Sequence, residues 1–151
     1  MNVPVKYLPK RLSKKDKAKQ KKQLQKSRAA YKKGIYINRK PLTSFKNKKS
    51  QHLINAEKLY KVNKVVINNN LAKKTGCSIK ALNKIVKKGI GAFYSSGSRP
   101  NQSAHSWGIA RLASSISGGK AAAIDYNILQ EGCLKNSKAL KLSRFISNNK
   151  L

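Results

Sequence analysis

The side chains most able to do covalent chemistry in this chain are a few serines, one histidine and one aspartate. Ser96, Ser98 and Ser106 lie near His105, and Asp125 follows further along. These residue types could form a Ser-His-Asp triad, but a triad depends on geometry that spacing does not establish. The G-x-S-x-G nucleophile elbow is missing, and only four residues are Asp or Glu, which disfavours paired-carboxylate or metal-assisted catalysis. We therefore expect a protein that is not an enzyme, with no cofactor and no small-molecule substrate.

The two cysteines are the other reactive side chains. Cys77 and Cys133 belong to no C-x-x-C pair, and only His52 and His105 could join them, so we expect no metal site. The N-terminus lacks a signal-peptide pattern, and no apolar run is long enough to span a membrane. These patterns favour a soluble, unsecreted protein with free thiols, and a disulfide is the alternative.

Charge restricts the class of partner. The formal net charge is +31 at pH 7. Residues 89–134 contribute only +1 of it, and the flanking segments carry the rest. Such a polycation is expected to work against something anionic: nucleic acid, a lipid headgroup surface or an acidic protein wall.

A lysine-rich helix is predicted near the N-terminus to present part of this charge. It begins at the S-x-x-D cap of Ser13 and ends at Gly34. Because this helix is polar on nearly all sides, it either frays in solvent or folds against an external anionic surface. The lysines expected to contact that surface are Lys14, Lys15, Lys19 and Lys22.

Residues 71–89 resemble a helix-turn-helix of DNA-binding proteins. Gly76 would take the positive φ of the turn, and Ser78 would cap the second helix. In the functional interpretation the second helix lies against DNA through Lys80, Asn83, Lys84, Lys87 and Lys88. The alternative is an ordinary corner of two helices with a solvated lysine face.

The predicted fold class is mainly α, with one or two short strands. Strands are expected at residues 35–37 and 62–67, and a tight loop from Gly89 to Pro100. Further helices are predicted at residues 51–60, from Ser103, at 121–130 and at 137–147. The predicted organisation is a basic N-terminal arm, residues 1–50, and a compact helical domain, residues 51–151, that contains the near-neutral residues 89–134.

The near-neutral segment contains a candidate docking patch for another protein. Its members are polar or aromatic side chains near one loop: Arg99, Asn101, Gln102, His105 and Trp107. In the alternative interpretation these side chains satisfy buried backbone groups, and Arg99 pairs with Asp125 or Glu131.

Two sequence runs carry a resemblance to a known family. They are KGIGAFYSSGSRPNQ, at residues 88–102, and HSWGIARLAS, at residues 105–114. Together with the upstream YLPKRLSKKDKAKQKKQL and KTGCSIKALNKIV, they resemble small, very basic proteins of large DNA viruses of algae and protists, with related segments in some phages. The resemblance implies a viral setting and not a mechanism, and it assigns no catalytic or ligand role to any residue of this chain.

Charge and resemblance together predict a virion structural protein of a large icosahedral double-stranded DNA virus. We expect a minor capsid protein on the inner side of the capsid, present in host cytoplasm or nucleus during assembly. Its partners would be the major and other minor capsid proteins and an anionic membrane surface or viral DNA. The alternative is a DNA-binding protein that packages the genome in a nucleoid. An RNA-packing role ranks third, because arginine is scarce beside lysine.

Overall fold

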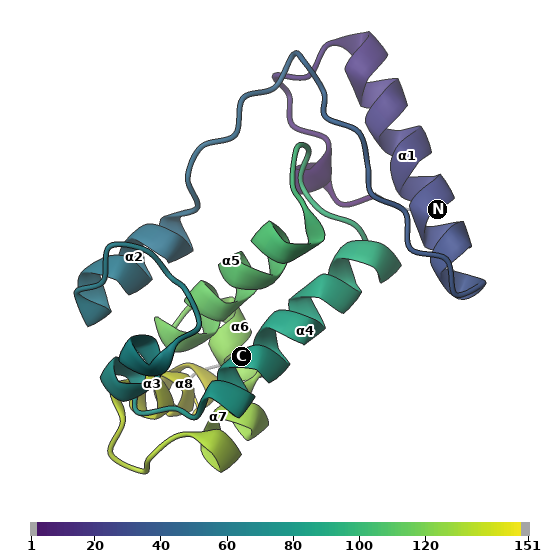
Figure 1. The fold of residues 1–151 in the computed structure, drawn as a ribbon. Helices are drawn as coiled ribbons and strands as arrows, with labels where there is room; N and C mark the ends of the chain where they lie inside the picture. Colours follow the sequence, from purple (N-terminus) through teal and green to yellow (C-terminus); the bar gives the residue numbers. More distant parts are fainter. Residues whose placement is uncertain (1–2, 149–151) are drawn as a thin grey trace. The chain divides into compact units, whose positions relative to one another are not determined.

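The computed structural model describes residues 3–148, and over this range the fold is mainly helical, as the sequence predicts. The elements are η1 (Val5–Tyr7), α1 (Lys14–Lys32), α2 (Gln51–Tyr60), α3 (Asn69–Thr75), α4 (Ile79–Ser95), α5 (Ala104–Ile116), α6 (Lys120–Ile124), α7 (Tyr126–Gly132) and α8 (Lys138–Asn148) (Figure 1). Within the described range, none of these helices is long and apolar enough to cross a membrane.

Contacts divide the chain into two units. The first unit combines residues 3–48 with residues 90–107, and the second combines residues 49–89 with residues 108–148. This grouping differs from the expected arm and domain, because part of the near-neutral segment belongs with the N-terminal residues. By sequence, the first unit holds 18 Lys and Arg against Asp16 alone, and the second holds nearly as many against three acidic residues. Each unit is therefore a polycation by itself.

Helix α1 of the first unit has one buried face, contrary to the expectation of a helix polar all round. Ser13 caps it by accepting a hydrogen bond from the Asp16 backbone N–H, and Gly34, with φ of +77°, follows its end as predicted. Leu24 is fully buried. The buried Gln20 donates from Nε2 to the carbonyl oxygens of Tyr7 and Ser98, 3.3 Å away in each case. The helix thus folds on partners within the chain.

The second unit contains the two helices predicted for residues 71–89, α3 and α4. Asn68 caps α3, Gly76 ends it with φ of +75°, and Ser78 accepts a hydrogen bond from the Ala81 N–H at the start of α4. Leu82 and Ile85 of α4 are fully buried. Helix α8 packs against α6 and α7, and its buried Ser143 hydroxyl donates to the carbonyl of Ala122.

Three local expectations are wrong. Residues 35–37 and 62–67 form no strand, and the part of the chain that the structure describes contains only an isolated bridge between Cys77 and Cys133. Helix α4 continues to Ser95, so the expected loop is confined to the residues after it. Gly89 allows α4 and α5 to approach closely, since a Cβ atom at this position would stand 2.7 Å from the Cα of Gly108. The single helix expected at 121–130 is two helices, α6 and α7.

Candidate functional site

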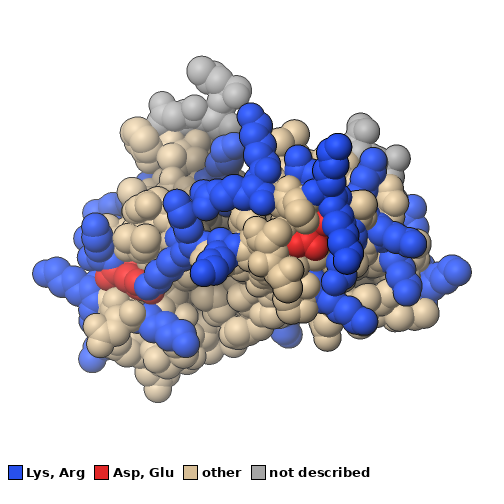
Figure 2. Space-filling model, turned by 90° about the horizontal axis from the view of Figure 1, so that it is seen from above, with Lys and Arg blue, Asp and Glu red and all other residues tan. Residues whose placement is uncertain are grey.

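The lysines predicted to contact an anionic partner are exposed. They form one group on α1 and one on α4: Lys14, Lys15, Lys19, Lys22, Lys80, Lys84, Lys87 and Lys88. Figure 2 shows Lys and Arg side chains spread widely over one face, whereas acidic atoms show in only two small areas. The candidate site is therefore a set of cationic surfaces.

A groove lies between α1 and the chain segment after Ile37. We call it the α1 groove; it has a volume of about 290 Å³ and is lined by Lys19, Lys22, Gln23, Lys26, Ile37, Asn38, Arg39 and Lys40. Gln23 joins its two walls, because its Nε2 donates to the Lys40 carbonyl at 3.3 Å and its Oε1 accepts from the Lys40 N–H at 2.6 Å. Five of the eight lining residues, all described, are cationic and none is acidic.

Arg39 is the most enclosed cation of the α1 groove. Its guanidinium donates to the Ser27 hydroxyl, the Phe93 carbonyl and the Ser98 hydroxyl at 2.8–2.9 Å, and lies 3.8 Å from the centre of the Phe93 ring. Burial lowers the pKa of Arg39 to about 10, so the group is still charged at neutral pH. A fixed, charged guanidinium with neutral hydrogen-bond partners raises the positive potential of the groove.

Asp16, the acidic residue of the first unit, is hydrogen bonded to Ser44, which does not line the α1 groove. Asp16 accepts hydrogen bonds from both the hydroxyl and the backbone N–H of Ser44. These bonds hold the pKa of Asp16 below its ordinary value. Its charge is thereby held at the Ser44 turn.

Three tyrosines form a cluster next to the α1 groove. Ring centres of Tyr31 and Tyr36 are 5.8 Å apart, and those of Tyr36 and Tyr94 are 5.1 Å apart. Tyr36 is 64% exposed. The Tyr94 hydroxyl donates to Asn38, which lines the groove, so the cluster and the groove adjoin. We call this group the tyrosine cluster.

The second cationic surface lies on α4. Lys80, Lys84 and Lys87 are exposed on this helix, the second of the two helices predicted for residues 71–89. Lys88 is exposed as well, but its Nζ lies 3.1 Å from a carboxylate oxygen of Asp125. Lys88 therefore has a structural partner in addition to its predicted role.

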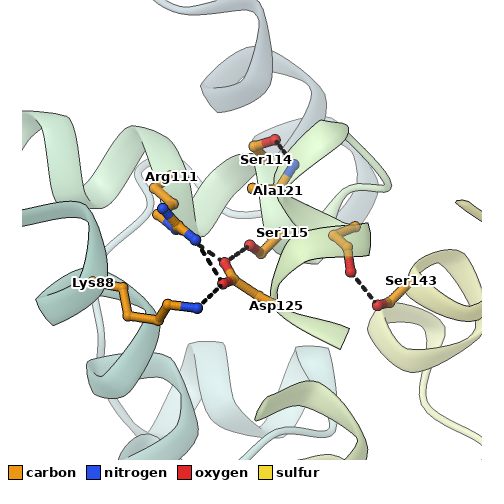
Figure 3. A network of polar contacts seen from close by, with 8 residues as sticks. Lys88, Arg111, Ser114, Ser115, Ala121, Asp125 and Ser143 are labelled. Carbon is orange, nitrogen blue, oxygen red and sulfur yellow. Dashed lines mark hydrogen bonds and ion pairs between the residues drawn. The ribbon is translucent and has the colours of Figure 1, made fainter. Parts of the chain in front are cut away.

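Asp125 is the centre of a buried polar network (Figure 3). Its side chain is fully buried and accepts hydrogen bonds from Arg111 at 2.8 and 3.1 Å, from the Ser115 hydroxyl at 2.6 Å and from Lys88. Burial raises the pKa of Asp125, but these hydrogen bonds and the charge of Arg111 outweigh it and hold that pKa below its ordinary value. The alternative interpretation gave Arg99 either Asp125 or Glu131 as its partner. Its pairing with Asp125 is wrong, because Arg111 and Lys88 take that place.

The predicted docking residues gather at the loop between α4 and α5, in different environments. Arg99 and His105 are exposed, Gln102 accepts from the Ser106 hydroxyl, and the half-buried Trp107 ring meets Tyr7 edge to face at 5.9 Å. Asn101 supports the fold, since its side chain hydrogen bonds to both backbone groups of Leu42 and to a third backbone group, the carbonyl of Phe45. Asn101 therefore fits the alternative interpretation, in which the side chain hydrogen bonds to backbone groups of its own chain.

Three of the five side chains considered for a catalytic triad, Ser98, Ser106 and Asp125, have other hydrogen-bond partners. Ser98 receives a hydrogen bond from Arg39 and donates to the Arg99 carbonyl, and Ser106 bonds to Gln102 and Ser103. Asp125 belongs to the second unit and is held by Arg111, Ser115 and Lys88.

The expectation of free thiols is wrong: Cys77 and Cys133 form a disulfide. The turn at Gly76 and the end of α7 bring two backbones together, with hydrogen bonds from the Ser78 N–H to the Gly132 carbonyl and from the Leu134 N–H to the Gly76 carbonyl. Spacing in sequence could not show this antiparallel pairing of distant segments.

Sequence reasoning also missed Arg39, Gln23 and the tyrosine cluster. The available signals were an arginine in a segment where lysine dominates and Tyr36 between two isoleucines.

Comparison with known proteins adds one finding and two absences. A protein-family model described as a family of unknown function matches residues 4–131. No curated protein and no solved structure matches the chain.

Proposed function

Because the chain belongs to the DUF5824 family, whose function is unknown, we propose a function from its own surfaces: it is a non-enzymatic structural protein of the virion of a large icosahedral double-stranded DNA virus. In this proposal it is a minor capsid protein on the inner side of the capsid, bridging the shell to an anionic inner surface. The observation that carries the proposal is the exposure of lysine faces on both units.

The disulfide is a second support. Disulfides persist in oxidising settings, among which are virions outside the cell, and are rare in cytosolic proteins. The resemblance of residues 88–102 and 105–114 to proteins of large DNA viruses points the same way.

Docking to capsid proteins is assigned to the loop between α4 and α5. Arg99 is exposed in this loop and His105 is exposed in the first turn of α5 next to it. Tyr7, packed against Trp107, supports the loop. Contacts made by this loop depend on shape and hydrogen bonds, because the segment is nearly neutral. They should persist at about 0.5 M salt, where exposed charge pairs are strongly screened.

Stepwise disassembly of purified particles tests the proposal. The protein should stay with the shell at high salt, and Arg99→Ala should lower its incorporation without changing its stability. Arg144→Ala, which removes another exposed arginine from α8, is the matched control and should incorporate normally. Absence from the particles would contradict the proposal. Equal incorporation of both variants would contradict the assignment of docking to the loop that holds Arg99.

The runner-up is a DNA-binding nucleoid protein, favoured by Lys80, Lys84 and Lys87 on the exposed face of α4. Release of the protein with the genome would support this role. Replacing the three lysines with glutamine should then lower the salt dependence of duplex binding, by about 0.9 in slope for each lost phosphate contact.

A further inference from the structure

The α1 groove offers a line of cations and not a single charged point. Lys19, Lys22 and Lys26 follow one another at helical spacing on α1, and the residues between the first and the last rise about 10 Å along the axis. Arg39 and Lys40 face them from the other wall. This arrangement suits a chain of phosphates better than one small anion.

The groove is held in shape before any ligand arrives. Gln23 is hydrogen bonded to both backbone groups of Lys40, which fixes the distance between the walls. Arg39 is fixed by three hydrogen bonds. Binding therefore requires little ordering of the protein, which favours affinity.

The tyrosine cluster supplies a different kind of contact at the same place. Tyr36 and Tyr31 are exposed, although burial of their rings would be favourable. Their ring planes are tilted by 46°, so the two rings do not stack fully on one another. Asn38 connects the cluster with the groove through its hydrogen bond from Tyr94.

We propose that the α1 groove and the tyrosine cluster form a binding site for single-stranded nucleic acid. A cationic groove that follows the phosphate backbone, next to aromatic rings that stack on bases, is the combination that such proteins use. In a duplex the bases are paired and stacked on one another, so the rings would gain nothing. This inference rests on the proposed function, in which the lysine faces contact an anionic partner. It names single-stranded nucleic acid as the partner of the lysines on α1.

Binding of the full-length, oxidised protein to labelled oligothymidine, measured by fluorescence anisotropy, tests the site. Tyr36→Leu removes the ring and keeps an apolar side chain; it should weaken binding about 10-fold and leave binding of a duplex of equal length unchanged. Tyr36→Phe should bind like the wild type. An unchanged thermal midpoint in both variants shows that Tyr36→Leu acts on binding.

Charge is tested by a triple change, Lys19→Gln with Lys22→Gln and Lys26→Gln. It should lower the salt slope of oligothymidine binding by about 2, from about 0.7 for each phosphate contact. The matched control is Lys80→Gln with Lys84→Gln and Lys87→Gln, which loses the same charge from α4 and should alter the slope less.

Several outcomes would overturn the inference. Equal effects of the two triple changes would mean that oligothymidine binds the cationic surface in general and not the groove. No effect of Tyr36→Leu would mean that the attraction is by charge alone. If binding to vesicles of anionic lipid depends on Tyr36 and binding to oligothymidine does not, the site would be assigned to a membrane surface.

The proposed function and this inference can fail separately. If oligothymidine binding depends on Tyr36 while particles lack the protein, the proposed function fails and this inference stands. If particles contain the protein while oligothymidine binding does not depend on Tyr36, only the inference fails.

Discussion

Leu24 of α1 fills the space beside Gly97, where a Cβ atom would stand 2.7 Å from Leu24 Cδ2. The two residues come from the two segments of the first unit, residues 3–48 and 90–107. A substitution that disturbs this contact therefore tests whether the N-terminal helix and residues 90–107 fold together.

Substitution of Gly97 should destabilise the first unit. In Gly97→Ala, the φ of +123° strains the backbone by about 1–3 kcal/mol, and the fully buried Leu24 must also move. Chemical denaturation monitored by circular dichroism measures the loss. Gly91→Ala is the control, because Gly91 lies within α4 with nothing near its Cβ position, and it should be neutral or stabilising. Equal effects of the two changes would contradict the packing.

Removal of the Asp125 charge should lower the free energy of unfolding by about 3 kcal/mol at neutral pH, because the largely buried Arg111 would lose its charged partner. Asp125→Asn keeps the shape of the side chain. The control, Glu57→Gln, breaks the more exposed pair with Lys49 and should cost less than about 1 kcal/mol.

The same variant has a defined pH dependence. Because the pKa of Asp125 is lowered by folding, its stabilisation is complete above the ordinary aspartate pKa of about 4 and is lost as the pH falls through the lowered value. The difference in stability between wild type and Asp125→Asn should therefore shrink as the solution is acidified below about pH 4. A difference that is constant at all pH values would assign the effect to packing.

The disulfide should stabilise the protein by as much as about 4 kcal/mol, because it closes a loop of 56 residues in the unfolded chain. Replacing Cys77 and Cys133 with serine should lower the denaturation midpoint. Wild-type protein that is unfolded, reduced and refolded should have the same denaturation midpoint as this variant. The midpoint of the variant itself should not change when reductant is added. A wild-type midpoint insensitive to reductant would show that the cysteines are not paired.

Truncation of residues 1–48 should affect the two units differently. Residues 90–107 would lose Gln20, Leu24 and Arg39 as partners and should lose protection in amide hydrogen exchange. Residues 108–148 should keep it. Uniform protection in both ranges would favour the arm and domain expected from the sequence.

The helices were predictable because their signals are local. Ser13, Ser50 and Ser103 are caps with hydrogen bonds to the following backbone, and Gly34 and Gly76 take positive φ where the sequence predicts ends. The expected strands failed for the same reason: a short run such as residues 35–37 needs a partner strand, and local sequence does not reveal whether one exists.

The candidate site was predictable only in part. Exposed lysines such as Lys19 and Lys22 follow from composition and helical spacing. The groove walls, by contrast, depend on the pairing of Gln23 with Lys40, and the ring contacts depend on the meeting of Tyr36 with Tyr94. Contacts between residues distant in sequence are decided by tertiary packing, which no local pattern encodes.

The disulfide also determines how the molecule would carry a mechanical load. A pull on the two ends of the oxidised chain passes through the bond between Cys77 and Cys133, so the chain from 78 to 132 is shielded from tension. Residues 90–107 lie inside this shielded loop, whereas their partners in residues 3–48 lie outside it. Tension would therefore separate the two segments of the first unit before it stretches α5, α6 or α7. In a protein that bridges two layers, the load would therefore act on this contact and would spare α5, α6 and α7 while the disulfide is intact.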